Sequence, residues 1–282
     1  MSRVDLHAHT TASDGVRTPA GLVDYALGRR LSVIAITDHD STEGLDAALA
    51  HAAGRFEVWP GVEISTDVPG TEIHVLGYLL NHHDPRLAAS LARLRSGRVD
   101  RAKGMVEKLA ALGAPIEWRR VQELAGSGTV GRPHVAQALL EAGHISEFRE
   151  AFNKYIGRNG PAYVERYKLT PAEAIRLILD ADGLPVLAHP LYIGSAAETG
   201  KQFDLRDLLP ELVQAGLAGI ETYYPGYTPE INAELLTLAD EFDLIPTGGT
   251  DYHGGNITSV ELGEVDVPWS TVERILAWKA RL

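Results

Sequence analysis

The chain of 282 residues contains no cysteine. This absence excludes disulfide bonds, cysteine-ligated zinc sites and thiol catalysis, and it fits a reducing compartment. No stretch approaches the roughly 20 apolar residues that a membrane-spanning helix needs, and no apolar run precedes the first predicted strand. We therefore expect no membrane partner, no signal peptide and a cytoplasmic location.

Basic residues are also scarce, since 26 Lys and Arg stand against 38 Asp and Glu and the formal net charge is −12. This balance argues against general coating of nucleic acid, and we expect no stable duplex partner. The scarcity is uneven, because residues 85–168 hold 15 basic against 8 acidic side chains. A basic segment in an acidic frame suggests that the frame holds cations and the segment an anion. Solvated helix faces would explain many of these charges, but they do not require the skew in sign.

Short apolar runs alternate with amphipathic stretches, a pattern typical of β/α proteins. We expect strands at residues 3–10, 31–37, 56–63, 72–78, 184–190, 217–222 and 244–250. Only about seven residues separate the third and fourth of these, too few for a crossover helix, so the fourth strand should break the alternation. Residues 85–168 show no strong strand and are predicted to form a helical insertion, while 1–84 and 169–282 form the main domain.

Histidines and carboxylates gather where the predicted strands end. His7 and His9 share one face of the first strand, about 7 Å apart at ~3.3 Å per residue, so both can reach one metal ion. A pair of buried, hydrogen-bonded histidines is the alternative. Six of the 11 histidines fall at such places, which chance would not produce. The candidate metal ligands are His7, His9, Asp14, His39, Glu63, His74, His189, Asp251 and His253.

Nine ligands suit two or three ions, because a catalytic zinc uses about three. Imidazole and carboxylate without thiolate admit Mn²⁺, Fe²⁺, Co²⁺ or Zn²⁺, of which Mn²⁺ is our first expectation. We expect Glu63 to bridge two ions. Asp38 is a candidate for holding an imidazole in place, and Asp5 either does the same or is simply buried and hydrogen-bonded.

Together these motifs resemble those of the PHP (polymerase and histidinol phosphatase) family. They are Asp5-Leu6-His7-Ala8-His9-Thr10, Ser13-Asp14-Gly15, Thr37-Asp38-His39, Gly61-Val62-Glu63, Ala188-His189-Pro190 and Asp251-Tyr252-His253. The resemblance implies an α/β fold, a distorted seven-stranded (β/α)7 TIM-like barrel with a helical insertion, and phosphoester hydrolysis at a trinuclear metal centre. It implies one ion on His7, His9, Glu63 and Asp251, a second on Glu63, His74 and His189, and a third on Asp14, His39 and His253.

Gly131-Arg132-Pro133-His134 in the insertion resembles the branch of the family that acts on nucleotides. That branch includes a nucleoside 3′,5′-bisphosphate phosphatase and a 5′-to-3′ exoribonuclease. We therefore expect removal of the 3′-phosphate from nucleoside 3′,5′-bisphosphates by a metal-bridged hydroxide, with Glu63, His189 and Asp251 as catalytic residues. One phosphate would lie on the metals while the other docks on the basic insertion. No lysine ends a predicted strand, which weighs against a carboxylated-lysine site and a Schiff base.

The insertion should supply most substrate contacts. Arginine can bind phosphate through two parallel hydrogen bonds, a histidine can bind phosphate or protonate the leaving oxygen, and a tyrosine can stack on a base. Each charge could equally be a solvated surface residue, and the tyrosines could be packing residues. The candidates are Arg101, Lys103, Arg132, His134 and Arg158, with Tyr223, Tyr224 and Tyr227 after the sixth predicted strand.

Three other functions fit the same residues. The first is a 5′-3′ exonuclease that acts on short RNA or DNA oligonucleotides. The second is a histidinol phosphate phosphatase, but a cationic substrate tail would need an acidic pocket and the insertion is basic. The third is a metal-stabilised accessory module, which would require a damaged ligand set, whereas all nine positions are filled here.

Overall fold

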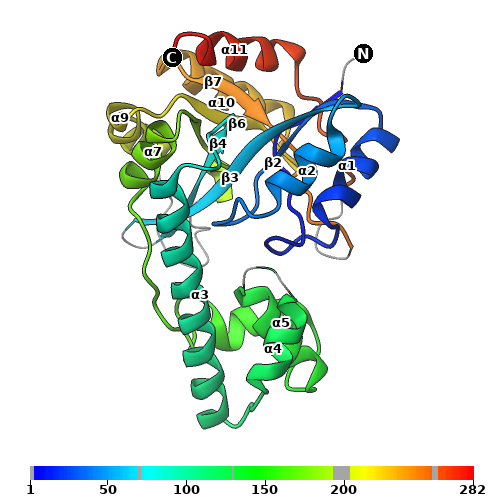
Figure 1. Cartoon of the computed structure of the whole chain (residues 1–282). Coiled ribbons are helices and arrows are strands. Elements are labelled where there is room, and N and C mark those ends of the chain that lie inside the picture. Colours follow the sequence, from blue (N-terminus) through cyan, green and yellow to red (C-terminus); the bar gives the residue numbers. More distant parts are fainter. Residues whose placement is uncertain (1–2, 69–70, 127, 129, 193–203, 256–259) are drawn as a thin grey trace. The chain divides into compact units, whose positions relative to one another are not determined.

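Figure 1 shows the computed structural model of the chain, which describes residues 3–68, 71–126, 128, 130–192, 204–255 and 260–282. The chain forms two compact units. The first comprises Met1–Ala89 and Leu169–Leu282, and the second comprises Ser90–Lys168. Among the described residues, no helix is both long enough and apolar enough to cross a membrane.

A seven-stranded sheet, with its strands in chain order, forms the frame of the first unit. The strands are β1 (Arg3–Asp5), β2 (Leu31–Ile36), β3 (Glu57–Val68), β4 (Thr71–Tyr78), β5 (Leu184–Leu187), β6 (Gly219–Tyr223) and β7 (Ile245–Gly248). Neighbours are parallel except at β4, which is antiparallel to both β3 and β5. The fold is α/β, and the expected break at the fourth strand is confirmed, because the two residues between β3 and β4 cannot form a crossover.

Backbone hydrogen bonds join the chain after β1 to the end of β7 and to the chain that follows it. The Leu6 N–H donates to the Gly248 carbonyl (3.2 Å), and the Tyr252 N–H donates to the His7 carbonyl (3.3 Å). The His9 N–H in turn donates to the Tyr252 carbonyl (2.9 Å). The extensions of the first and last strands therefore lie side by side.

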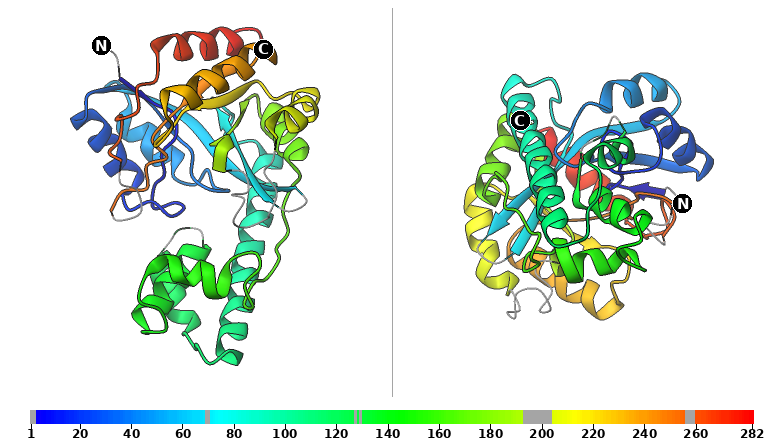
Figure 2. Two further views of the ribbon diagram at one scale, coloured as in Figure 1. Left: turned by 180° about the vertical axis from the view of Figure 1, so that it is seen from behind. Right: turned by 90° about the horizontal axis from the view of Figure 1, so that it is seen from below.

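Helices line the outside of this sheet (Figure 2). They are α1 (Pro19–Gly28), α2 (Leu45–Ala52), α7 (Pro171–Asp180), α9 (Leu205–Ala215), α10 (Pro229–Glu241) and α11 (Trp269–Lys279), with a 3₁₀ turn, η2 (Pro190–Tyr192). In α1, α7 and α10 a threonine precedes a proline, and its hydroxyl accepts a backbone N–H of the first turn. This pairing of an N-cap with proline at the first helical position sets where each helix begins.

Strand β2 shows why the sequences of the sheet's strands are continuous apolar runs. Val33 and Ala35 pack with Trp59 in one core cluster, whereas Ile34 and Ile36 pack on the other face against residues of α1 and α2. All four strand residues are at most 1% exposed. Both faces of the strand are therefore buried, and alternation with polar residues is not required.

The second unit is helical in the part of it that the structure describes. It contains the rest of α3 (Pro85–Ala111), which begins in the first unit, with α4 (Trp118–Ala125), α5 (Arg132–Glu141), α6 (Phe148–Ala151) and a π-helical turn, η1 (Phe152–Ile156). Met105, Leu109, Val121 and Leu139 belong to a buried cluster of this unit alone. The unit therefore has its own core.

Strands β5 and β7 end three and two residues earlier than predicted, and three further elements differ from the expectation. The strand predicted at 3–10 ends at Asp5, because the N–H groups of His7 and Ala8 donate to the side chains of Asp5 and Thr37 and not to a neighbouring strand. The third strand continues to Val68, because β4 extends its ladder, so Glu63 lies within a strand and not at its end. Helix α11 is not predicted from the sequence, and it buries Thr271, Val272 and Ile275.

Asp5 is buried and hydrogen-bonded, the simpler of its two expected roles. It is 0% exposed and accepts hydrogen bonds from the Thr250 N–H (2.9 Å), the Thr250 hydroxyl (2.6 Å) and the Gly263 N–H (2.8 Å). Burial raises its pKa, and these hydrogen bonds oppose the shift. The carboxylate therefore ties β1 to the chain that follows β7.

We predict that Asp5→Ala lowers the free energy of unfolding by about 3 kcal/mol. The substitution leaves buried N–H groups without an acceptor, and each such group costs roughly 1–3 kcal/mol. Urea unfolding of the metal-free protein in EDTA, followed by circular dichroism, measures the change. The control is Asp240→Ala on the exposed side of α10, which should change stability by less than about 0.5 kcal/mol. Equal losses in both variants would refute the role of Asp5.

Candidate metal centre

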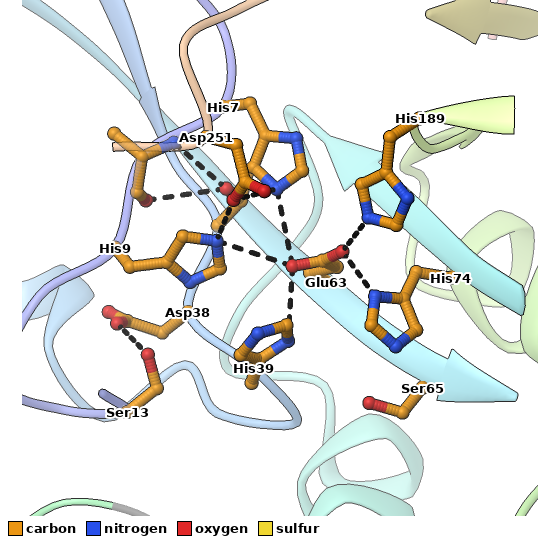
Figure 3. Close-up of polar contacts among 12 residues, drawn as sticks. His7, His9, Ser13, Asp38, His39, Glu63, Ser65, His74, His189 and Asp251 are labelled. Carbon is orange, nitrogen blue, oxygen red and sulfur yellow. Dashed lines mark hydrogen bonds and ion pairs between the residues drawn. The ribbon is translucent and has the colours of Figure 1, made fainter. Parts of the chain in front are cut away.

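The parallel strands bring most of the nine predicted ligands to one edge of the sheet. His39 lies three residues after β2, His189 two residues after β5 and Asp251 three residues after β7. Carboxyl ends of parallel strands meet at the same edge, where functional groups commonly gather. Figure 3 shows these side chains directed toward Glu63 and toward one another.

Glu63 and His74 reach the same edge from inside their strands. The ladder pairs Ser65 of β3 with His74 of β4, and β4 runs opposite to its neighbours. The first half of β4 therefore lies where the parallel strands end. This reversal places His74 Nδ1 2.7 Å from Glu63 Oε1. The expectation that these two residues end their strands is wrong, but both reach the site.

His7 and His9 both face the site from the extended chain after β1. Each is 0% exposed, and their ring centroids are 5.2 Å apart. His7 Nε2 and His9 Nε2 lie 3.2 and 3.3 Å from Glu63 Oε2. They also lie 3.3 and 3.1 Å from Asp251 Oδ1. Two imidazoles and two carboxylates thus converge on one point.

Three overlapping groups have ligand atoms that all lie within 4.8 Å of one another. They are His9, Asp14, His39 and His253; His7, His9, Glu63 and Asp251; and His39, Glu63 and His74. His189 joins through Glu63, with its Nε2 3.0 Å from Oε1. The structure thus brings all nine residues together, while their division among individual ions stays a prediction.

His9 Nδ1 is buried in this cluster and has no hydrogen-bond partner among the described residues. His39 Nδ1 lies 3.0 Å from Glu63 Oε2, and Asp14 Oδ1 lies 3.3 Å from His253 Nε2, so both face other members of the cluster. A buried polar atom without a partner costs about 1–3 kcal/mol, so such atoms need an explanation. Lone pairs of imidazole and carboxylate that face one another are the donor set that a divalent cation of the first transition row takes. The cluster therefore fits divalent metal binding.

Electrostatics at Glu63 point the same way. Burial alone would raise the pKa of Glu63, but His39, His74 and His7 hold it well below its usual range. Burial likewise opposes charge on His74, yet Glu63 raises the pKa of that imidazole to about 9. For His39 burial prevails and lowers the pKa to about 3. The carboxylate is held ionised at the centre of the site.

A second concentration of negative charge surrounds His253. Burial opposes its charged form, but Asp14 and Asp251 raise the pKa of His253 to about 10. The pKa values of both carboxyl groups lie well below their usual range despite burial, chiefly through His253 for Asp14 and His7 for Asp251. The carboxylates thus attract positive charge throughout the cluster, a role that bound cations fill.

Comparisons with known proteins identify the family, although no protein-family model matches the chain. A 5′-3′ exoribonuclease of Haemophilus influenzae is 35% identical over 252 residues, covering 89% of this chain and 90% of that protein. A 3′,5′-nucleoside bisphosphate phosphatase of Chromobacterium violaceum is 30% identical over 273 residues, covering 94% of this chain and 92% of that protein. A crystal structure described as a metal-dependent phosphoesterase from Bifidobacterium adolescentis superimposes with a TM-score of 0.87 at 31% identity, covering 98% of this chain and 96% of that chain.

The chain belongs to the PHP family of metal-dependent phosphoesterases. The resemblance expected from the strand motifs is confirmed. This PHP protein is an enzyme that hydrolyses phosphoric esters. The alternative hypothesis of a non-enzymatic accessory module is therefore rejected.

Glu221 contacts two residues of the candidate metal centre, and the sequence did not predict it. It lies in the middle of β6, is 0% exposed, and its Oε1 is 3.1 Å from His7 Nδ1. Its Oε2 accepts the backbone N–H of His189 at 2.7 Å. His189 has a positive φ of 27°, a strained conformation that this bond helps to hold. A carboxylate inside an apolar run was the signal that could have identified it.

Tyr224 supports Asp251 in a similar way. Its hydroxyl donates to Asp251 Oδ2 at 2.7 Å, and its ring meets that of His189 edge-on at 5.7 Å. Burial and the Asp251 carboxylate raise the pKa of Tyr224, so it stays a donor. The sequence predicts either base stacking or packing for Tyr223, Tyr224 and Tyr227, of which Tyr223 lies at the end of β6. The contact with Asp251 gives Tyr224 a positioning role that the sequence did not predict. Tyr227 lies beyond it and accepts the Leu191 N–H at 3.3 Å.

Asp38 does not hold an imidazole as predicted. Its Oδ1 accepts the Thr10 N–H (2.7 Å) and the Ser13 hydroxyl (2.6 Å), and its Oδ2 accepts the Thr10 hydroxyl (2.7 Å). The carboxylate therefore fastens the turn between His9 and Asp14. Asp38 therefore acts on the site indirectly, because this turn sets the positions of His9 and Asp14.

The predicted substrate-binding residues of the insertion all lie in the second unit. Arg101 and Lys103 are on α3, and the Lys103 ammonium is 5.6 Å from the Trp118 ring centroid. Arg132 and His134 begin α5, where His134 Nδ1 accepts the Gly131 N–H at 3.0 Å. Their roles and that of Arg158 stay predictions, as does the catalytic role of His134.

We predict that Glu221→Ala weakens metal binding about 10- to 100-fold, the usual cost of removing a group that orients a ligand. Equilibrium dialysis of the folded variant against Mn²⁺ measures the change, with circular dichroism to verify folding. Glu221→Gln keeps an oxygen acceptor for one of the two partners, so its loss should be smaller. Unchanged affinity in the alanine variant would show that His7 and His189 are held without Glu221.

Proposed function

We propose that this PHP phosphoesterase removes the 3′-phosphate of nucleoside 3′,5′-bisphosphates with two to three divalent ions, in the first place Mn²⁺. The observation that carries the proposal is the convergence of nine imidazole and carboxylate side chains in an acidic unit of a chain whose second unit is basic. The phosphatase of Chromobacterium violaceum, 30% identical over 94% of this chain, supports the same substrate class.

We assign the ligands as the family resemblance implies. His7, His9, Glu63 and Asp251 would hold one ion, Glu63, His74 and His189 a second, and Asp14, His39 and His253 a third. Bound cations of this kind supply a hydroxide at neutral pH and neutralise charge on the phosphoryl and leaving oxygens. We further infer that the sheet closes as a barrel between β1 and β7, with the second unit as its substrate-binding cap.

The chain's own residues prepare this chemistry. An Nδ1–H on His7 that donates to Glu221 leaves Nε2 with a lone pair toward Glu63 and Asp251. The Tyr224 hydroxyl orients the Asp251 carboxylate. Both contacts restrict ligand side chains before a cation binds, which reduces the reorganisation that the reaction requires.

His134 has a defined proton position. Because its Nδ1 accepts the Gly131 N–H, the neutral ring carries its proton on Nε2. It can therefore donate to a phosphoryl or leaving oxygen, the catalytic role that we propose for it. Arg132 follows Gly131 at the start of α5, and with Arg101, Lys103 and Arg158 it is proposed to bind the second phosphate. Tyr227 is proposed to contact the base.

Replacing His189 with asparagine should lower both the bound Mn²⁺ per chain and the activity, because one ligand of the proposed second ion is lost. Metal analysis of the purified protein, alongside phosphate release, measures both. His51→Asn is the control, since His51 lies on α2 outside the metal centre, with its side chain bonded to Asp24 and its backbone carbonyl accepting from Arg55. Loss of activity with full metal content would remove His189 from the ligand set.

The substrate assignment predicts that adenosine 3′,5′-bisphosphate is cleaved about 10- to 100-fold better than adenosine 3′-monophosphate, measured as kcat/KM. The two share the scissile phosphate, and a charge-assisted contact to the second phosphate contributes roughly 1.5–3 kcal/mol. Arg132→Ala should narrow this ratio. Equal kcat/KM for the two substrates would refute the proposal.

The second candidate is a 5′-3′ exonuclease on short oligonucleotides, because the Haemophilus influenzae exoribonuclease is 35% identical over 89% of the chain. A time course on a 5′-phosphorylated oligonucleotide separates the two functions. Stepwise release of mononucleotides supports the nuclease. An oligonucleotide that stays intact, with phosphate released from adenosine 3′,5′-bisphosphate in a parallel assay, supports the phosphatase.

A further inference from the structure

A second cluster of metal-ligating side chains lies in the first unit and shares no residue with the metal centre. It consists of Asp46, His82 and His83. Asp46 is in the first turn of α2, and the two histidines lie in the connection from β4 to α3. Nothing in the phosphoesterase reaction uses these residues.

The two imidazoles converge on one oxygen atom of Asp46. His82 Nε2 is 2.9 Å and His83 Nε2 is 3.4 Å from the same oxygen, Asp46 Oδ1. Zinc–nitrogen and zinc–oxygen bonds of about 2.0–2.1 Å in a tetrahedral site place neighbouring ligand atoms about 3.3 Å apart. The cluster is therefore near the spacing that such a cation needs, and the two ring centroids lie 4.1 Å apart.

The turn that carries the histidines is held at both ends. The Asn81 N–H donates to the Ala181 carbonyl (2.7 Å), and the Asn81 side chain accepts the His83 N–H (3.2 Å). Asp84 then caps α3 by accepting the N–H groups of Arg86 and Leu87, both at 2.9 Å. Two adjacent imidazoles are thus presented together, which lowers the entropy cost of chelation.

The surroundings leave room for a cation. Asp46 and His83 side chains are 72% and 67% exposed, and His82 is 13% exposed. Within the described part of the chain, neither Lys nor Arg forms an ion pair with Asp46. The arrangement can offer three ligands and leave the remaining positions to water.

The pair of His51 and Asp24 differs from this cluster. His51 Nε2 lies 2.8 Å from Asp24 Oδ1, but no second imidazole joins it. Arg55 instead places its guanidinium 3.3 Å from the same oxygen, so a cation already occupies this carboxylate. An ordinary surface hydrogen bond explains the His51 pair, whereas it does not explain two imidazoles on one oxygen.

We propose that Asp46, His82 and His83 form a peripheral site for one divalent cation of the imidazole-preferring class, Zn²⁺, Ni²⁺ or Cu²⁺. Two imidazoles with a single carboxylate disfavour Mg²⁺ and Ca²⁺. The ion joins the start of α2 to the start of α3 and so stabilises the folded first unit, because it binds the native arrangement and not the separated segments.

Retention of the untagged protein on resin-bound Ni²⁺ tests the paired imidazoles, because the side chains of the central site are at most 20% exposed whereas that of His83 is 67% exposed. Wild-type protein should bind and need more imidazole for elution than His82→Gln or His83→Gln. His51→Gln should elute like wild type. The proposal is overturned if His82→Gln elutes like wild type, since His83 alone would then explain retention, or if His51→Gln elutes as early as the other two.

Zinc binding in solution tests the third ligand. In equilibrium dialysis of Mn²⁺-loaded protein against Zn²⁺, wild type should bind one more Zn²⁺ per chain than His83→Gln, and exchange at the central site cancels in this difference. Asp46→Asn should weaken that extra site at least about tenfold. His82→Gln, His83→Gln and Asp46→Asn should all keep wild-type kcat/KM with saturating Mn²⁺. No difference in stoichiometry between wild type and His83→Gln would refute the peripheral site.

Discussion

A carboxylate without any solvent exposure lies at the centre of this protein, and the arrangement of the first unit accommodates it. Glu63 is surrounded by the imidazole nitrogens of five histidines at 2.7–3.3 Å. An ionised carboxylate taken out of water costs several kcal/mol unless opposite charge and hydrogen bonds compensate it. The five imidazoles come from the chain around β1, β2, β4 and β5. Compensation of one charge therefore depends on the order and direction of most of the sheet.

The reversed strand β4 is part of that solution. A parallel fourth strand would point its first half away from the edge where the other strands end. The antiparallel pairing with β3 brings His74 beside Glu63 instead. The hairpin thus replaces one β/α unit and contributes an imidazole that a regular alternation would place elsewhere.

The predicted metal ligands and the residues that support them differ in how readily a sequence reveals them. His7, His39, His189 and Asp251 are recognisable because each follows an apolar run, and the end of a strand is visible as a change of composition. Glu221 lies within such a run, so no change of composition marks it. Its supporting role depends on a contact with the backbone N–H of His189, which is 32 positions earlier in the chain. The partners of Asp38 likewise lie near it only after β1 and β2 have paired.

By itself, the sequence determined the α/β pattern, the break at the fourth strand, the helical character of residues 85–168 and the nine residues that gather at one edge, because hydrophobic period and residue chemistry are local properties. Only the tertiary structure decided that β1 ends at Asp5, that Glu63 lies within β3, and that Glu221 and Tyr224 hold the ligands. It also decided that His82 and His83 share an oxygen of Asp46, 36 positions away from His82. Each of these depends on contacts between segments far apart in the chain, and such contacts exist only once the strands have chosen their partners.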